Sequence, residues 1–349
     1  MFRPTQLPSF QNEYKPDGKT FWSVRPSSLG IKSINKTSLG ILKTVFEFDL
    51  VGTGEDEGQT AFHLNYAYGQ LGKFGAGQYN SAFMDYDVFP DILEYWGPPG
   101  MVFYRNIQLR YMPLMEGSSN LTFSLEMPGA SGDGGVFADR IELEGVKGQF
   151  YLPDFITEFK QEGKWGYVRL AGIIRSIKWE DVNEDSLSLD GSAVGWGGNV
   201  SSNINVTKND VLKLQAVYGE GIENYMNDAP VDIGIDTNFS GRSASRPVKG
   251  VTLPVTGITA FLDHSWSDHF SSSAGYSLIS IENSDAQSPD AFRKGQYIIA
   301  NLLYYPVDDV TTGVEFQWGQ RDNYGGFVSA DTKVQFSFQY NFSKIFGWN

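Results

Sequence analysis

Apolar and polar residues alternate with a period of two along most of the chain beyond residue 20. In the stretch KTVFEFDL, residues 43–50, one set of alternate positions is apolar and the other is mostly charged. Residues 119–127 and 210–218 repeat this pattern. Because successive side chains of a strand point to opposite faces, the pattern predicts β-strands with one apolar and one polar face.

The periodic segments predict fifteen strands, near residues 20–33, 37–51, 60–71, 74–82, 102–114, 119–127, 150–161, 165–178, 191–206, 210–223, 250–266, 269–282, 294–305, 309–320 and 330–343. Short turns are expected near Asn35, Gly72, Glu116, Gly163, Asn209, Ser267 and Asp308, and long connections near Glu55, Phe89, Gly132, Glu184, Gly234, Asp285 and Tyr324. This strict alternation is typical of an outer-membrane barrel, with short periplasmic turns and long external loops. The sequence therefore predicts an all-β, antiparallel transmembrane β-barrel that forms a single domain over residues 1–349.

The predicted number of strands is odd, whereas single-chain bacterial barrels have even numbers. The chain thus predicts a barrel of about sixteen strands whose first strand lies upstream of residue 1, with residues 1–19 as the first external loop. A strand within residues 224–249 is the alternative interpretation. It would reverse the direction of every later connection.

Composition narrows the class of protein. No apolar run reaches the roughly 18 residues that a transmembrane helix needs, and no apolar signal segment follows Met1. The chain has no Cys, which excludes disulfides and thiol chemistry. Its net charge of -14 argues against a nucleic-acid partner. The last predicted strand has aromatic residues at 336, 338, 340 and 342, like the C-terminal strands of outer-membrane barrels.

The connection within residues 75–111 is unusually long for a segment without predicted secondary structure, and such loops are often functional. We expect residues 83–101 to fold into the barrel and narrow the pore. This loop would bring acidic and aromatic side chains to the narrowest point, namely Asp85, Asp87, Asp91, Glu94 and Tyr95.

Strand parity predicts which wall residues face this loop. If the apolar positions face lipid, the intervening positions that face the lumen are Arg25, Lys43, Gln108, Arg110, Arg169 and Arg175. Arg105 has the opposite parity, but it lies at the start of its strand, where a bulge could turn it inward.

Two interpretations of these charges remain open. Arginines that face the loop acids would create a path for carboxylated solutes, because guanidinium groups bind carboxylates in a bidentate manner. Alternatively, the arginines pair with acids of the wall and loop and hold the loop in place.

The same stretch resembles the DcaP-like outer-membrane porins. The resemblance rests on Gly77-Gln78, Ser81, Phe83-Met84-Asp85, Pro90, Leu93, Gly97-Pro98, Gly100, Arg105, Gln108 and Arg110-Tyr111. The chain departs from the family at Tyr79-Asn80, where Thr-Trp is usual, and at Ile107, where Pro is usual. The resemblance implies a homotrimer of sixteen-stranded barrels in the bacterial outer membrane that passes small anions such as dicarboxylates.

Other functions remain as alternatives. A sugar channel would use an aromatic path of Tyr86, Tyr95, Trp96 and Tyr104. A β-sandwich lectin or enzyme that acts on polysaccharide would be soluble without detergent. The acidic segments at residues 55–57 and 180–185 could bind Ca²⁺ or, through divalent ions, lipopolysaccharide. No catalytic or nucleotide-binding motif is present, so we expect neither an enzyme nor a cofactor, and no metal site.

Overall fold

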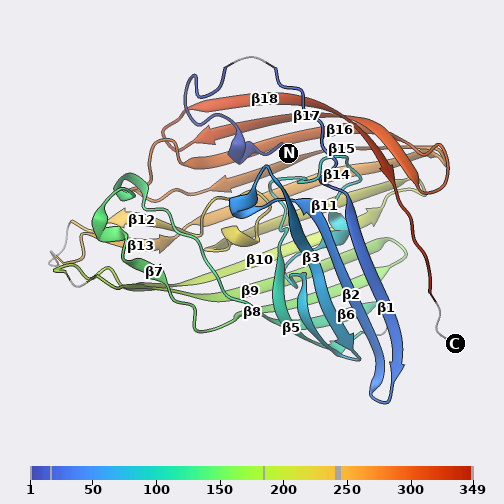
Figure 1. Ribbon diagram of the computed structural model, residues 1–349, viewed down its shortest axis with the longest axis horizontal. Coiled ribbons are helices and arrows are strands. Elements are labelled where there is room, and N and C mark those ends of the chain that lie inside the picture. The colour runs from blue at the N-terminus through green and yellow to red at the C-terminus, as the bar shows by residue number, and fades with distance from the viewer. Residues whose placement is uncertain (1, 16–17, 116, 184, 240–244, 347–349) are drawn as a thin grey trace.

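The computed structural model describes residues 2–15, 18–115, 117–183, 185–239 and 245–346. Fifteen strands pair in chain order and antiparallel, and they curve round as the wall of a barrel (Figure 1). They are β1 (Ser28–Thr37), β2 (Gly40–Val51), β3 (Thr60–Leu71), β4 (Phe74–Asn80), β5 (Arg105–Leu114), β6 (Ser119–Glu126), β8 (Asp154–Gly163), β9 (Gly166–Asp181), β10 (Gly191–Asn205), β11 (Asp210–Glu220), β14 (Pro254–Ser267), β15 (Phe270–Ile281), β16 (Phe292–Tyr304), β17 (Val310–Asn323) and β18 (Val328–Tyr340). The predicted all-β antiparallel fold is confirmed.

Strands β1 and β18 lie at the two ends of this order, and among the described residues they do not pair with each other. A further strand upstream of residue 1 stays a prediction. The alternative strand within residues 224–249 is not part of the wall. Instead, β12 (Ile233–Thr237) and β13 (Val248–Thr252) form a separate hairpin in the connection between β11 and β14, and β7 (Val146–Gly148) pairs with β9.

Several predicted boundaries are wrong, and the two largest errors lie at the first strand and near Tyr324. Strand β1 begins at Ser28 rather than at residue 20, so the turn expected near Asn35 lies at residues 38–39. The connection near Tyr324 is not long, because β17 extends to Asn323 and β18 starts at Val328. Gly326, with a φ of 88°, provides the left-handed conformation that this tight turn uses. Glu116 and Glu184 lie outside the described residues.

The two faces of the wall differ as the period-two pattern predicts. On β16, Tyr297 and Ile299 face inward and are fully buried, whereas Ile298 and Leu302 face outward and are 41% and 44% exposed. An apolar outer surface of this kind suits contact with lipid rather than with water. No helix in the described part of the chain is long and apolar enough to cross a bilayer.

Three segments fold inward against the wall. The first is the connection between β4 and β5, residues 81–104, which we call the inward loop and which contains η3 (Tyr86–Val88). The second is residues 221–232 after β11, with η6 (Glu223–Tyr225), called here the second loop. The third is residues 2–9, the strap, with η1 (Pro4–Gln6), which lies beside β16 and β17 (Figure 1). Residues 1–19 were predicted as an external loop, and the described part indeed contains no strand, but the strap lies against the inner wall.

The remaining short helices lie in the connections between strands. They are η2 (Gly54–Asp56), η4 (Gly135–Phe137) and η5 (Ile141–Leu143). Together with β7, η4 and η5 belong to the long connection between β6 and β8, at the rim that also carries the β12–β13 hairpin (Figure 1).

Candidate functional site

The inward loop crosses the space inside the wall and contacts strands that are far apart in the sheet. The Phe83 carbonyl accepts a hydrogen bond from Asn199 of β10 at 2.8 Å. Further along the loop, the Tyr95 hydroxyl donates to the Asp49 carboxylate of β2 at 2.5 Å, and the Gly100 amide donates to the Ser277 hydroxyl of β15 at 2.9 Å. The loop therefore divides the interior, as predicted for a pore-constricting element.

The position of residue 100 in the inward loop has no room for a side chain. A Cβ atom there would lie 2.1 Å from the Leu278 carbonyl oxygen and 2.8 Å from that of Ile258. The backbone of the loop therefore lies directly on the backbone of β14 and β15, and only glycine permits this approach.

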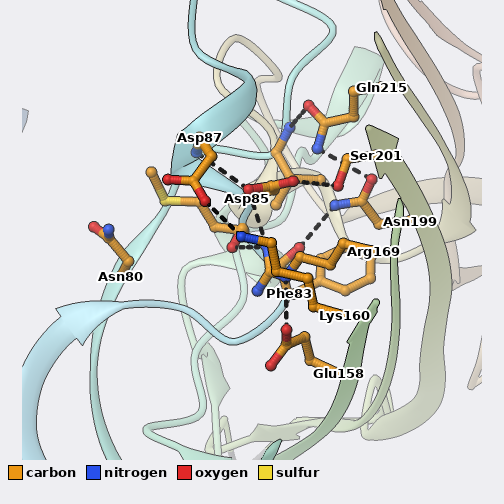
Figure 2. Close-up of polar contacts among 12 residues, drawn as sticks. Asn80, Phe83, Asp85, Asp87, Glu158, Lys160, Arg169, Asn199, Ser201 and Gln215 are labelled. Atoms are coloured by element: carbon orange, nitrogen blue, oxygen red, sulfur yellow. Dashed lines mark hydrogen bonds and ion pairs between the residues drawn. The ribbon is translucent and has the colours of Figure 1, made fainter. Parts of the chain in front are cut away.

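Asp85 is fully engaged by the wall (Figure 2). Its carboxylate accepts hydrogen bonds from Tyr167 at 2.8 Å and from Ser201, and it lies 3.8 Å from the Arg169 guanidinium. Arg169 also donates to the Glu158 carboxylate at 3.0 Å, to the Ala82 carbonyl at 2.9 Å and to the Met84 carbonyl. Arg169 therefore fixes the start of the inward loop to β8 and β9.

The other loop acids also have wall cations as partners. Asp87 pairs with Lys160 of β8 at 2.9 Å, Asp91 with Lys213 of β11 at 3.3 Å, and Glu94 with Lys333 of β18. Of these carboxylates, Glu94 is buried, whereas Asp87 and Asp91 are largely exposed. The loop acids therefore contribute less negative charge to the pore than their number suggests.

Tyr95 occupies a partly buried position above Asp49. Burial and the adjacent Asp49 carboxylate raise the pKa of the Tyr95 hydroxyl, so the group remains a proton donor. The Nδ1 atom of His63 lies 3.2 Å from the Asp49 carboxylate and 3.5 Å from the Tyr95 hydroxyl. The hydroxyl thus attaches the far end of the loop to β2.

Arg175 faces inward as parity predicts, but its side chain is only 1% exposed. It lies 2.9 Å from Asp154 and 2.9 Å from Asp232, and it donates to the Gly221 carbonyl at 2.5 Å. Asp232 in turn accepts the Ser131 amide at 2.9 Å. Arg175 is therefore not part of the pore surface, and the prediction that it lines the pore is wrong because the second loop covers it.

Arg110 and Arg105, both on β5, have different surroundings. Arg110 donates to the Gln108 side chain at 2.5 Å and lies 5.4 Å from the centroid of the Tyr79 ring. The Arg105 guanidinium lies 5.3 Å from the centroid of the Tyr66 ring, and its Nε is buried without a hydrogen-bond partner. Among the described residues, neither arginine lies within 4.0 Å of a carboxylate.

A cavity of about 440 Å³ lies beside Arg110 under the start of the inward loop. Its charged lining residues are Arg110, Lys160, Arg169, Asp85, Asp87 and Glu158. Since Lys160 and Arg169 are paired with these acids, Arg110 is the basic residue of the cavity that has no ion pair in the described part of the chain.

The remaining predicted site residues have other roles. Gln108 is 3% exposed and donates to the Tyr79 carbonyl at 3.0 Å, so it supports the wall. Lys43 is exposed near the β1–β2 turn. Arg25 is not in a strand, and one of its terminal nitrogens donates to the Gln59 carbonyl at 3.0 Å. The parity argument for Arg25 is therefore wrong.

Aromatic side chains that a sugar channel would need along its path are instead engaged in packing and hydrogen bonds with the second loop. The Trp96 indole donates to the Asn227 carbonyl at 2.7 Å, and the Tyr104 ring packs on that of Tyr225 with centroids 4.9 Å apart. Both partners belong to the second loop, which the sequence analysis missed. Residues 221–232 have no regular alternation, so nothing in the sequence alone placed them inside the barrel.

No group of three or more His, Asp or Glu side chains among the described residues is arranged to hold a metal ion. One of the acidic segments proposed for Ca²⁺ includes Glu184, which is outside this part of the chain. His264 near one short turn pairs with Asp210 at 2.6 Å.

A wall of antiparallel strands with an apolar outer surface and a charged loop folded inside defines an outer-membrane channel of the porin class, not an enzyme. The chain belongs to the DcaP outer membrane protein family, whose model matches residues 18–342. Its location is therefore the bacterial outer membrane. A comparison with curated proteins finds no match.

Solved porin structures share the fold. The outer-membrane channel DcaP of Acinetobacter baumannii has a TM-score of 0.77 at 19% identity, covering 94% of this chain and 89% of that one. The trimer form of OmpT of Vibrio cholerae gives 0.55 at 11% identity, with 90% of each chain covered. The anion-selective porin of Comamonas acidovorans gives 0.51 at 11% identity, covering 90% and 87%.

Proposed function

We propose that this porin passes small hydrophilic solutes by diffusion and favours small anions, dicarboxylates among them. The observation that carries the proposal is the contrast in ion pairing at the constriction. Each loop acid named above has a wall cation as a partner, whereas Arg105 and Arg110 lack a carboxylate partner among the described residues. A guanidinium without a carboxylate partner can offer its donors to a passing carboxylate.

The two arginines form neighbouring cationic groups along the path. They are five residues apart on β5, but the Arg110 side chain donates to the carbonyl of Asn80, the β4 residue that pairs with Arg105. The Tyr66 and Tyr79 rings, with centroids 5.0 Å apart, lie between them. An anion leaving one arginine would meet the other before it reaches the opposite rim, and multiple weak sites favour conduction.

We further propose that the assembly is a homotrimer in contact with outer-membrane lipid and lipopolysaccharide. The trimer form of the Vibrio cholerae protein has the same fold, and the exposed apolar outer face offers a surface for such contacts. The anion selectivity in the name of the Comamonas acidovorans protein belongs to that protein, but it is compatible with this fold.

The test is the reversal potential of the purified protein in a planar bilayer under a KCl gradient, followed by conductance with added succinate. The proposal predicts chloride selectivity and block by succinate. Arg105→Gln and Arg110→Gln should each weaken both effects. Arg140→Gln, which removes an arginine that is 67% exposed in the connection between β6 and β8, is the matched control and should change neither.

Cation selectivity without a succinate effect would overturn the proposal. It would mean that the exposed carboxylates of Asp87 and Asp91 dominate the field despite their partners.

A further inference from the structure

The strap packs into the interior through its apolar side chains. Phe2 and Leu7 are each only 7% exposed and pack in a cluster with Tyr297 of β16 and Ile92 of the inward loop. The backbone is held as well, since the Thr5 carbonyl accepts from Arg321 of β17 at 2.6 Å. The strap therefore lies between the wall and the constriction.

Arg3 is the charged centre of the strap. Its Nε lies 2.8 Å from the Asp228 carboxylate of the second loop, and another nitrogen lies 3.3 Å from Glu57 in the β2–β3 connection. Its guanidinium carbon is 4.0 Å from the centroid of the Trp96 ring, in the inward loop. One side chain thus contacts three separate loops.

Asp228 depends on the strap for its partners. Its side chain is 0% exposed, and besides Arg3 it accepts hydrogen bonds from the amide of Thr5 at 3.0 Å and from the Thr5 hydroxyl. A buried carboxylate that loses its cation is strongly disfavoured. Without Arg3, the second loop would therefore tend to move so that Asp228 reaches water.

Such a movement would reach the constriction directly. The Asn227 side chain donates to the Trp96 and Pro98 carbonyls at 2.8 Å and 2.9 Å, and the Asn227 amide donates to the Met101 carbonyl at 2.8 Å. Asn227 is the neighbour of Asp228. Hydrogen bonds therefore join the second loop to residues 96–101 of the inward loop.

We propose that residues 2–9 are a strap that sets the width of the channel, and that Arg3 is a positioning residue that keeps the inward loop and the second loop in their narrow arrangement. This inference depends on the channel role of the protein and not on its anion preference. An incorrect ion selectivity would leave it unchanged.

Single-channel conductance in a planar bilayer tests the proposal. Arg3→Ala should raise conductance, by roughly twofold, because a constriction governs the flow of ions. Asp228→Asn leaves no buried carboxylate without a cation, so it should raise conductance less than Arg3→Ala does. Arg3→Lys, which retains a cation but not the fork of donors, should give an intermediate value. Wild-type conductance in Arg3→Ala would overturn the proposal, since a purely structural role changes stability without changing the open pore.

A reversible disulfide between the strap and the wall provides a second test if Arg3→Ala does not fold. A Cβ atom at Gly295 would lie 2.8 Å from Cβ of Pro4, about 1 Å closer than a disulfide requires, and 2.9 Å from Cζ of Phe292, so the strap and the Phe292 ring must both shift to accommodate the bond. The chain has no other Cys to compete. The variant Arg3→Ala/Pro4→Cys/Gly295→Cys is refolded under oxidising conditions so that the disulfide forms. The variant Gly295→Cys alone is the control.

The oxidised triple variant holds the strap on β16 but supplies no cation to Asp228, so its conductance should lie between those of the wild type and Arg3→Ala. Adding a reductant in the bilayer should raise its conductance, while the control variant should not respond. If reduction changes nothing, the strap does not set the channel width.

Discussion

Strands β5 and β9 each present arginines to the interior, but the surroundings of these arginines are opposite. On β9, Arg169 and Arg175 are buried and paired with carboxylates. On β5, Arg105 and Arg110 lie beside aromatic rings and have no carboxylate within 4.0 Å among the described residues. An arginine on the inner face of the wall is therefore not necessarily a pore residue. Its charge is available to a solute only if no carboxylate of the protein pairs with it.

The comparison also separates two kinds of contribution. A buried, paired arginine contributes to the architecture, since its removal leaves buried carboxylates without compensation. An arginine on aromatic faces makes weaker contacts, of roughly 0.5–2 kcal/mol, and keeps donors for a solute. Substitutions on β9 should therefore affect stability, and substitutions on β5 should affect selectivity.

The largest effect is expected for Arg175→Met. Because Asp154 and Asp232 would both lose their buried partner, the free energy of unfolding should fall by about 3–5 kcal/mol. Urea unfolding in detergent, followed by tryptophan fluorescence, measures this change. Arg140→Met is the control at an exposed position. A loss as small as that of the control would remove the distinction between β9 and β5.

A smaller effect is expected for the buried carboxyl group of Glu223, which forms no ion pair among the described residues, unlike the two carboxylates that pair with Arg175. Glu223 is 0% exposed, and among the described residues neither carboxylate oxygen has a hydrogen-bond partner. Burial and the nearby Asp232 raise the pKa of Glu223 well above its ordinary value. In the unfolded chain the group ionises in the ordinary glutamate range, so wild-type stability should fall as pH rises from there toward the folded-state pKa.

Glu223→Gln removes this titration. The variant should become progressively more stable relative to the wild type as pH rises from 4 to 8. Unfolding in urea at a series of pH values provides the measurement. Parallel pH profiles for the two proteins would show that Glu223 is ionised in the folded protein.

The smallest effect is expected for the exposed pair of Asp87 and Lys160. The Asp87 side chain is 58% exposed, so solvent screens the pair and its coupling should not exceed about 1 kcal/mol. A double-mutant cycle of Asp87→Asn and Lys160→Met in urea unfolding gives this value. A coupling as large as that expected for Arg175 would mean that exposure does not separate the two classes of charge.

The wall was predictable because its signal is local. The period of two places Gln108, Arg110, Arg169 and Arg175 on the inner face, and the structure agrees for all four. The errors lie where that period is interrupted. Residues 20–27 are apolar enough to resemble a strand, yet β1 begins at Ser28, and this shift removes the basis for the assignment of Arg25.

The contents of the barrel were less predictable, because they depend on contacts between distant residues. Both interpretations of the arginines were open from the sequence, and only the positions of Asp154, Asp232 and Glu158 decide between them for Arg169 and Arg175. The strap and the second loop have no periodic signal. Arg3 and Asp228 are 225 positions apart, and nothing local indicates that they meet.

The attachment of the inward loop makes the constriction depend on the last two strands of the chain. The amides of Leu93 and Glu94 donate to Glu315 of β17 at 2.6 Å and 2.9 Å, and the Leu93 carbonyl accepts from Gln335 of β18 at 2.7 Å. These partners are more than two hundred positions later in the chain. The inward loop therefore reaches its final position only in a wall that includes β17 and β18, and a wall without these two strands has no fixed constriction.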